Sequence, residues 1–166
     1  YVTRLDNDSL KNINELSLDL ILNFGGGIWK GDVLKASKFG LLSMHHADNK
    51  VNRGGPPGFW EVFKKSDSTG FTIQLLTEDL DGGKIVSRGS AQTSRFWSTN
   101  YANIRLSALR EWLRILRSFN SGFHFNIFNE ISIYDQPLFK DPSILQIIAY
   151  IFDRLFFFFK KSILLL

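Results

Sequence analysis

The side chains best suited to chemistry in this sequence gather near residue 45. Residues 41–45, Leu-Leu-Ser-Met-His, form an apolar run typical of a strand. Side chains alternate along a strand, so Ser43 and His45 share one face and can act together. His46 then points elsewhere, which disfavours a metal site built on both histidines. A structural role for a single histidine at a strand end stays open.

The composition narrows the chemistry available to the chain. It contains no cysteine, which excludes disulfides, thiolate metal clusters and a cysteine nucleophile. A chain without cysteine fits a reducing compartment, and we expect a cytoplasmic location. The net charge is +4, but lysines and arginines are interspersed with acids. This pattern indicates a solvated surface and not a nucleic-acid stripe, although contact with tRNA stays open.

The first half of the chain predicts an α/β unit. With 166 residues and 44% hydrophobic content, one globular domain is expected. Residues 18–24 predict a buried parallel strand. Residues 31–40 predict a short helix capped by Asp32, with Gly40 just past its end. The next strand, 41–45, completes a β-α-β pattern.

The middle of the chain predicts a helix and then a hairpin. Pro57 suits the first position of a helix. Residues 69–77 and 84–93 predict two antiparallel strands. The expected buried side of the helix consists of Phe59, Trp60 and Phe63.

Two further helical or apolar stretches follow. Residues 98–119 form an amphipathic pattern with arginines on the face expected to be solvated. The expected buried face is Ile104, Ala108, Leu109, Trp112, Ile115, Leu116 and Phe119. Residues 144–166 are apolar, but charged residues interrupt them before the ~20 positions that a membrane span needs. They predict a packing or interaction tail, and a homodimer through this tail is one outcome.

Two glycine-rich stretches have weak meaning when taken alone. The glycines at 25–27 follow a strand but lack the spacing of a nucleotide-binding loop. They still mark the carboxyl end of a strand, where open α/β sheets hold ligands. Asp81 lies in Glu-Asp-Leu-Asp-Gly-Gly and by itself indicates a solvated turn.

Taken together, residues 18–117 resemble the folate-dependent formyltransferases, a family that acts on methionyl-tRNA, glycinamide ribonucleotide and nucleotide sugars. The ordered pattern is an Asp-Leu-Ile strand, a glycine and apolar residues before a histidine, Arg-Gly and Pro, Thr-Gly-x-Thr-Ile, and Asp-x-Gly. An ordered set over about a hundred residues is far more specific than one motif. The matching positions after the first strand are Gly40, His45, Arg53, Gly54, Pro57, Thr69, Gly70, Thr72, Ile73, Asp81 and Gly83.

The resemblance implies a partial Rossmann-like fold with a mixed, mostly parallel sheet and an antiparallel hairpin. Residues 1–119 would be the carboxyl-terminal half of a formyltransferase catalytic domain, starting at about the fourth strand of the family's sheet. Residues 120–166 would be an aromatic and apolar extension.

The resemblance also implies a formyl transfer from the co-substrate 10-formyltetrahydrofolate to a primary amine. His45 and Asp81 would be catalytic, and no metal is expected. Ser43 replaces the family's asparagine and would stand in for its amide, with weak or absent activity as the alternative. Hydrolysis of the formyl folate and a non-catalytic folate-binding or interaction remnant are the other hypotheses. The implied folate-binding residues are Phe24, Gly25, Gly26, Gly27, Ile28, Trp29, Glu78, Leu80 and Asp81.

Overall fold

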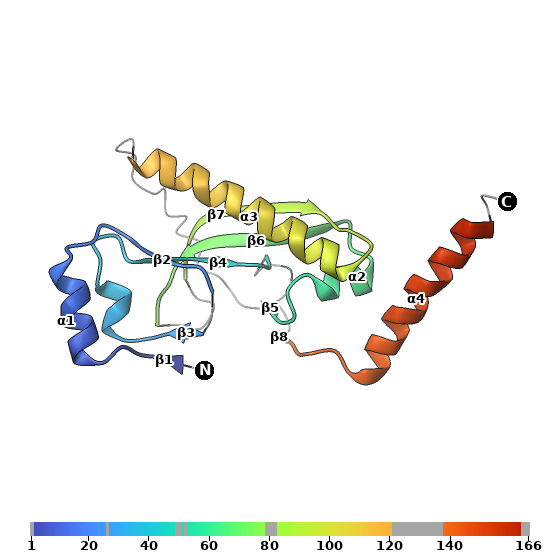
Figure 1. Ribbon diagram of the computed structural model, residues 1–166, viewed down its shortest axis with the longest axis horizontal. Helices are drawn as coiled ribbons and strands as arrows, with labels where there is room; N and C mark the ends of the chain where they lie inside the picture. The colour runs from blue at the N-terminus through green and yellow to red at the C-terminus, as the bar shows by residue number, and fades with distance from the viewer. Residues whose placement is uncertain are drawn as a thin grey trace.

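A four-stranded sheet forms the centre of the protein (Figure 1). The computed structural model describes residues 2–25, 27–48, 51, 53–78, 83–120 and 138–163. The sheet has the order β2-β4-β6-β7. Its strands are β2 (Ile21–Asn23), β4 (Leu41–His45), β6 (Ser68–Leu75) and β7 (Lys84–Gln92).

The sheet combines parallel and antiparallel pairing. β2 and β4 run parallel, with Asn23 opposite Ser43. β4 pairs antiparallel with β6, and β6 pairs antiparallel with β7. The predicted mixed α/β sheet with an antiparallel hairpin is therefore confirmed, and strand 41–45 has the predicted bounds. The expectation that the sheet is mostly parallel is wrong, because one of its three strand pairings is parallel and two are antiparallel. The strand predicted over 18–24 is shorter and only partly buried because β2 lies at the edge of this sheet.

Helix α3 (Trp97–Asn120) covers one face of the sheet, as Figure 1 shows. Its inner side and the strands form the larger core, in which Ile104, Ala108, Trp112 and Ile115 are buried as predicted. Leu109 is 40% exposed, so its predicted burial is wrong. It lies about 100° around the helix from Ala108 and so leaves the inner face.

Short elements lie around a second core that includes Leu41 of β4. They are β1 (Val2–Thr3), α1 (Asn7–Glu15), β3 (Ile28–Trp29) and the 3₁₀ helix η1 (Asp32–Lys35). Val33 and Leu34 of η1 pack against Leu41 in this second core. The cap predicted at Asp32 is wrong: Gly31, with a φ of 85°, precedes the helix and Asp32 is its first residue. A single 3₁₀ turn forms here in place of the longer predicted helix.

Helix α2 (Phe59–Lys64) begins later than the sequence predicts. Gly58 is its amino-terminal cap and has a φ of 72°, a left-handed conformation that glycine adopts without a steric penalty. Pro57 therefore lies before the cap, and its predicted place as first helical residue is wrong. Phe59 and Trp60 are buried as predicted, whereas Phe63 is half-buried.

The fully buried Asn100 joins three elements at the start of α3. Its Oδ1 accepts a hydrogen bond from Ser94 N at 2.9 Å. Its Nδ2 donates to Gly58 O at 2.9 Å, and the same amide is hydrogen-bonded to the Thr69 hydroxyl. Asn100 thus fixes the cap of α2 and the first part of β6 relative to α3. Thr69 of the Thr-Gly motif has a structural role here.

Replacement of Asn100 with alanine should lower the free energy of unfolding by about 2–4 kcal/mol, since several buried polar groups lose their partner. Urea unfolding monitored by circular dichroism measures the change. Asn103→Ala is the matched control, because its amide is exposed and, among the described residues, donates to Ser94 Oγ alone at 2.9 Å. We expect that control to stay within about 0.5 kcal/mol of the wild type. Equal losses in the two variants would contradict the assigned role.

Helix α4 (Ile144–Ile163) follows the short strand β8 (Leu138–Phe139), which pairs parallel with β5 (Arg53–Gly54). Its inner side is held to the domain: the Tyr150 hydroxyl accepts from Trp97 N at 3.0 Å, and Lys65 Nζ lies 2.9 Å from Asp153 Oδ1. Buried Arg154 donates to Val62 O at 3.2 Å.

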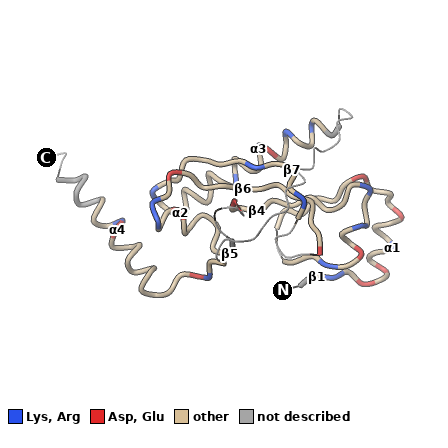
Figure 2. Tube along the Cα trace, turned by 180° about the vertical axis from the view of Figure 1, so that it is seen from behind, with Lys and Arg blue, Asp and Glu red and all other residues tan. Residues whose placement is uncertain are grey.

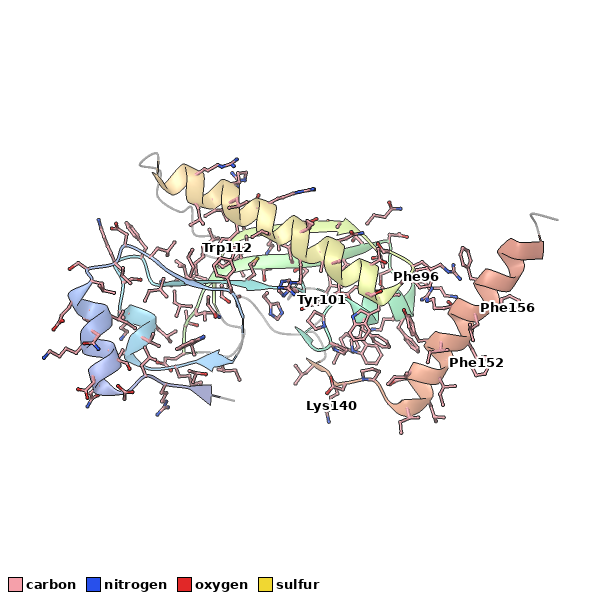
Figure 3. The ribbon with its side chains drawn as sticks, in the orientation of Figure 1. Phe96, Tyr101, Trp112, Lys140, Phe152 and Phe156 are labelled. Atoms are coloured by element: carbon pink, nitrogen blue, oxygen red, sulfur yellow. The ribbon has the colours of Figure 1, made fainter. Side chains whose placement is uncertain are left out.

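The outer side of α4 is apolar and exposed. Phe152 is 66% exposed and Phe156 is 72% exposed, and Figure 3 shows both on the side turned away from the domain. Within the described residues, no helix is long and apolar enough to cross a membrane. The domain boundary predicted near residue 120 adjoins residues outside the described ranges and stays a prediction.

Candidate functional site

A cavity of about 410 Å³ lies at the carboxyl ends of β2 and β4. Its volume falls within the roughly 300–1,000 Å³ typical of small-molecule sites. The wall consists of the loop after β2, the end of β4, and parts of β6 and α3. The lining residues are Asn23, Phe24, Gly25, Gly27, Ile28, Trp29, Ser43, Met44, His45, His46, Gln74, Leu76, Thr77, Tyr101 and Arg105.

Most of the residues expected at the site line this one cavity. Ser43 and His45 lie in its wall, together with five residues of the predicted folate loop: Phe24, Gly25, Gly27, Ile28 and Trp29. Of the remaining predicted residues, the structure describes Glu78. The Glu78 carboxylate accepts a hydrogen bond from Gly31 N at 2.8 Å and does not line the cavity. Gly26, Leu80 and Asp81 lie outside the described residues.

Three polar side chains form a row across the sheet beside the histidine. Asn23 is opposite Ser43 on β4, and Ser43 is opposite Gln74 on β6. The Asn23 Nδ2 donates to Ser43 Oγ at 3.1 Å. Residues two apart on a strand share a face, so His45 lies on the same face as Ser43. The cavity thus combines an imidazole, a hydroxyl and two carboxamides.

Apart from the rings of the two histidines, two buried polar atoms in the cavity wall have no hydrogen-bond partner among the described residues. They are the Trp29 Nε1 donor and the Gln74 Oε1 acceptor. An unpaired buried polar atom costs about 1–3 kcal/mol, so a ligand that supplies both an acceptor and a donor would recover this energy. The wall is suited to a polar heteroaromatic ligand.

His46 lines the same cavity as His45. Its ring packs edge-on against Tyr101 of α3, with the ring centroids 5.9 Å apart. Burial lowers the pKa of His46 from 6.5 to about 4, and the positive charge of Arg105 and neighbouring His45 contribute further. The imidazole of His46 is therefore neutral at neutral pH and packs against Tyr101.

The depressed pKa of His46 makes stability depend on pH. The unfolded chain takes up a proton below about pH 6.5, whereas the folded chain resists protonation down to about pH 4. The free energy of unfolding should therefore fall as the pH drops from 6.5 toward 4. Because the ring is partly exposed, we expect about 1 kcal/mol or less between pH 6.5 and 5.

Urea unfolding of the wild type and of His46→Gln at pH 7 and pH 5 measures this effect. The variant should lose less stability than the wild type on acidification. An equal loss in both chains would show that other groups cause the pH dependence.

The segment after His45 packs directly on β6. Asp48 lies against Gly70, where an added Cβ would come within 2.5 Å of the Asp48 Cβ. Arg88 of β7 donates to Asp48 Oδ1 at 2.6 Å. The glycine of the Thr-Gly motif therefore permits the close approach of this segment.

In the part of the chain that the structure describes, no group of acids and histidines is placed to hold a metal ion.

The lining residues that the sequence patterns did not assign to the site include Asn23, Gln74, Tyr101 and Arg105. Asn23 was detectable as a polar residue near the end of the apolar run 18–24. Tyr101 and Arg105 are one helical turn apart on α3, and Figure 3 shows Tyr101 extending from that helix toward the strands. Arg105 adds a cation at this part of the wall. Elsewhere basic and acidic positions are interspersed along the trace (Figure 2), as the composition predicted.

No family model matches the chain. The methionyl-tRNA formyltransferase of Bacillus thuringiensis (strain Al Hakam) is 30% identical over 84 residues, which cover 50% of this chain and 27% of that protein. The chain thus spans about a quarter of the length of this curated relative. The methionyl-tRNA formyltransferase of Bacillus mycoides (strain KBAB4) matches to the same extent.

Similar solved structures include the formyltransferase PseJ from Anoxybacillus kamchatkensis, in complex with UDP-4,6-dideoxy-4-formamido-L-AltNAc and tetrahydrofolate. Its TM-score is 0.64 at 20% identity, over 85% of this chain and 72% of that one. A formyltetrahydrofolate deformylase from Pseudomonas syringae has a TM-score of 0.60 at 16% identity, over 74% of this chain and 44% of that one. This chain is therefore similar in sequence to part of the methionyl-tRNA formyltransferases and shares the fold of the solved formyltransferases.

Proposed function

We propose that this protein transfers a formyl group from 10-formyltetrahydrofolate to a primary amine. The single observation that carries the proposal is one cavity that holds Ser43, His45 and the loop after β2 together. The complex of PseJ with tetrahydrofolate and a formamido sugar supports the same ligand class by analogy. The sequence similarity to methionyl-tRNA formyltransferases supports the same reaction class.

The described residues fit the pterin end of a folate. A pterin carries ring N–H donors and a carbonyl acceptor on a flat aromatic system. Trp29 Nε1 and Gln74 Oε1 supply a complementary donor and acceptor, and both are buried without a partner among the described residues. Phe24 and Ile28 add apolar wall beside them. When bound, the folate supplies an activated formyl group to the cavity.

In the proposed reaction the amine nitrogen bonds to the formyl carbon while the bond from that carbon to the folate nitrogen breaks. The proton lost by the amine ends on the folate nitrogen. His45 polarises the formyl oxygen as a hydrogen-bond donor. Asp81 favours the protonated imidazole and assists removal of the amine proton, as the resemblance implies. The Ser43 hydroxyl lies on the same strand face as His45.

The direct test incubates the full chain with 10-formyltetrahydrofolate and two probe acceptors, a UDP-linked 4-amino-4,6-dideoxy sugar and methionyl-tRNA. We expect tetrahydrofolate and a formylated amine in equal amounts, measured by mass spectrometry. Tetrahydrofolate with free formate would identify a hydrolase and contradict formyl transfer. Folate binding without either product would identify a binding module.

A second assay tests folate binding independently of the acceptor. Tetrahydrofolate should quench the fluorescence of Trp29, which lines the cavity. Trp29→Phe should remove most of the quenching, whereas Trp97→Phe should not, because Trp97 lies away from the cavity at the start of α3 and donates to Pro57 O. Equal quenching in both variants would argue against folate at this site.

The homodimer predicted through the tail depends on the outer side of α4. Its exposed aliphatic and aromatic side chains would be covered by a second copy. Light scattering coupled to size exclusion should give a dimer mass for the wild type and a monomer mass for Phe156→Glu. A wild-type monomer would contradict this prediction.

A further inference from the structure

The carboxamide of Asn23 is held in the cavity wall from both ends. Its Oδ1 accepts from Gly25 N at 3.4 Å, and its Nδ2 donates to Ser43 Oγ at 3.1 Å. Both partners line the same cavity. The amide is thus fixed in orientation before any ligand binds.

One donor of this amide remains available. A carboxamide nitrogen carries two hydrogens, and Ser43 takes one of them. Among the described residues, the second hydrogen has no acceptor. Asn23 is only half-buried and ends β2 at the cavity, so this donor is accessible to a ligand.

The position of Asn23 relates this donor to His45. In the parallel register Asn23 lies directly beside Ser43, and His45 is two residues further along β4 on the same face. Neighbouring strands are about 4.8 Å apart, so the amide and the imidazole flank the same part of the cavity. Two donors that flank one point suit an oxygen that gains negative charge.

We propose that Asn23 is a catalytic hydrogen-bond donor to the formyl oxygen, and that Ser43 is the positioning residue that orients its amide. This inference rests on the proposed function and assigns the amide donor of the site to strand β2. As the amine nitrogen bonds to the formyl carbon, charge moves onto the formyl oxygen and the Asn23 N–H stabilises it. The serine at position 43 accepts the other amide hydrogen.

The test compares binding of 10-formyl-5,8-dideazafolate with binding of 5,8-dideazafolate, which lacks the formyl group. Calorimetry on the full chain gives the preference for the formyl compound. We expect Asn23→Ala to reduce that preference about tenfold, the value of one net hydrogen bond. Ser43→Ala should give a smaller reduction, since the amide stays present but loses one of its two supports.

Turnover supplies the second measurement. Asn23→Ala should lower kcat by about 10²- to 10³-fold with little change in KM for the folate. Asn23→Asp, which removes the donor but keeps the size, should behave in the same way. Asn103→Ala, on the exposed side of α3, is the control for a general effect of amide removal.

The outcomes separate this inference from the proposed function. If the wild type binds neither compound, the proposed function fails and the inference fails with it. If the wild type prefers the formyl compound and Asn23→Ala keeps that preference, only the inference fails. Thermal melting of each variant identifies misfolding. If Asn23→Ala melts early, the preference measured for Asn23→Asp decides whether the inference holds.

Discussion

Replacement of His45 with asparagine is expected to lower formyl transfer by about 10²- to 10⁴-fold, the usual contribution of an acid or base in the transition state. The imidazole ends β4 at the cavity and shares a strand face with Ser43. Asparagine keeps a donor of similar size but cannot carry the proton. The loss should therefore appear in kcat, while KM for 10-formyltetrahydrofolate stays within a few-fold.

His46→Asn provides the comparison for this result. His46 packs against Tyr101 and has a pKa near 4, so it holds no proton at neutral pH. We expect a loss of less than about tenfold from this change, because it alters packing and not proton transfer. Equal losses in the two variants would contradict a special role for His45.

Replacement of Gly70 with alanine should damage both folding and activity. The added Cβ would lie 2.5 Å from the Asp48 Cβ and 3.1 Å from Asp48 N. Backbone cannot yield as a flexible side chain does, so the segment after His45 must move away from β6. We expect a loss of about 2–4 kcal/mol in the free energy of unfolding, typical of overpacking with strain. Displacement of His45 by about 1 Å should cost a further 10²-fold in activity.

Gly25→Ala is the control for stability. A Cβ at Gly25 would meet nothing within 4 Å, so its unfolding free energy should stay within about 0.5 kcal/mol of the wild type. The Asp48 to Arg88 ion pair gives a structural readout, because Gly70→Ala should break the 2.6 Å contact. A Gly70→Ala crystal structure that retains this contact would contradict the argument.

Local patterns predicted those elements in which neighbouring residues determine the conformation. Strand 41–45 follows Gly40 and is a continuous apolar run, so its bounds were correct. The hairpin of β6 and β7 followed from alternation and a short connection. The face of α3 that carries Ile104, Ala108 and Trp112 followed from helical spacing.

Predictions failed where tertiary contacts or backbone torsions determine the position at which a helix begins. The left-handed torsion at Gly58 delays the start of α2, although a proline precedes it. Gly31 also has a positive φ, of 85°, and is the cap before η1 in place of Asp32. These conformations depend on the packing around them and have no local spacing pattern.

The candidate site was predictable only where local spacing determines which side chains share a face. Ser43 and His45 are two residues apart on one strand, so their shared face follows from the sequence. Asn23 and Gln74 join them only through strand pairing between elements far apart in the chain. Tyr101 and Arg105 reach the cavity because α3 crosses the sheet (Figure 1), which no local pattern specifies.

The central claim is that the cavity binds the formyl end of a folate between His45 and Asn23. A crystal structure of the full chain with 10-formyl-5,8-dideazafolate tests this most directly. We predict the formyl oxygen within hydrogen-bond distance of both side chains, and the pterin-like ring beside Trp29 and Gln74. A ligand bound outside this cavity, or one whose formyl group points away from His45, would contradict the claim.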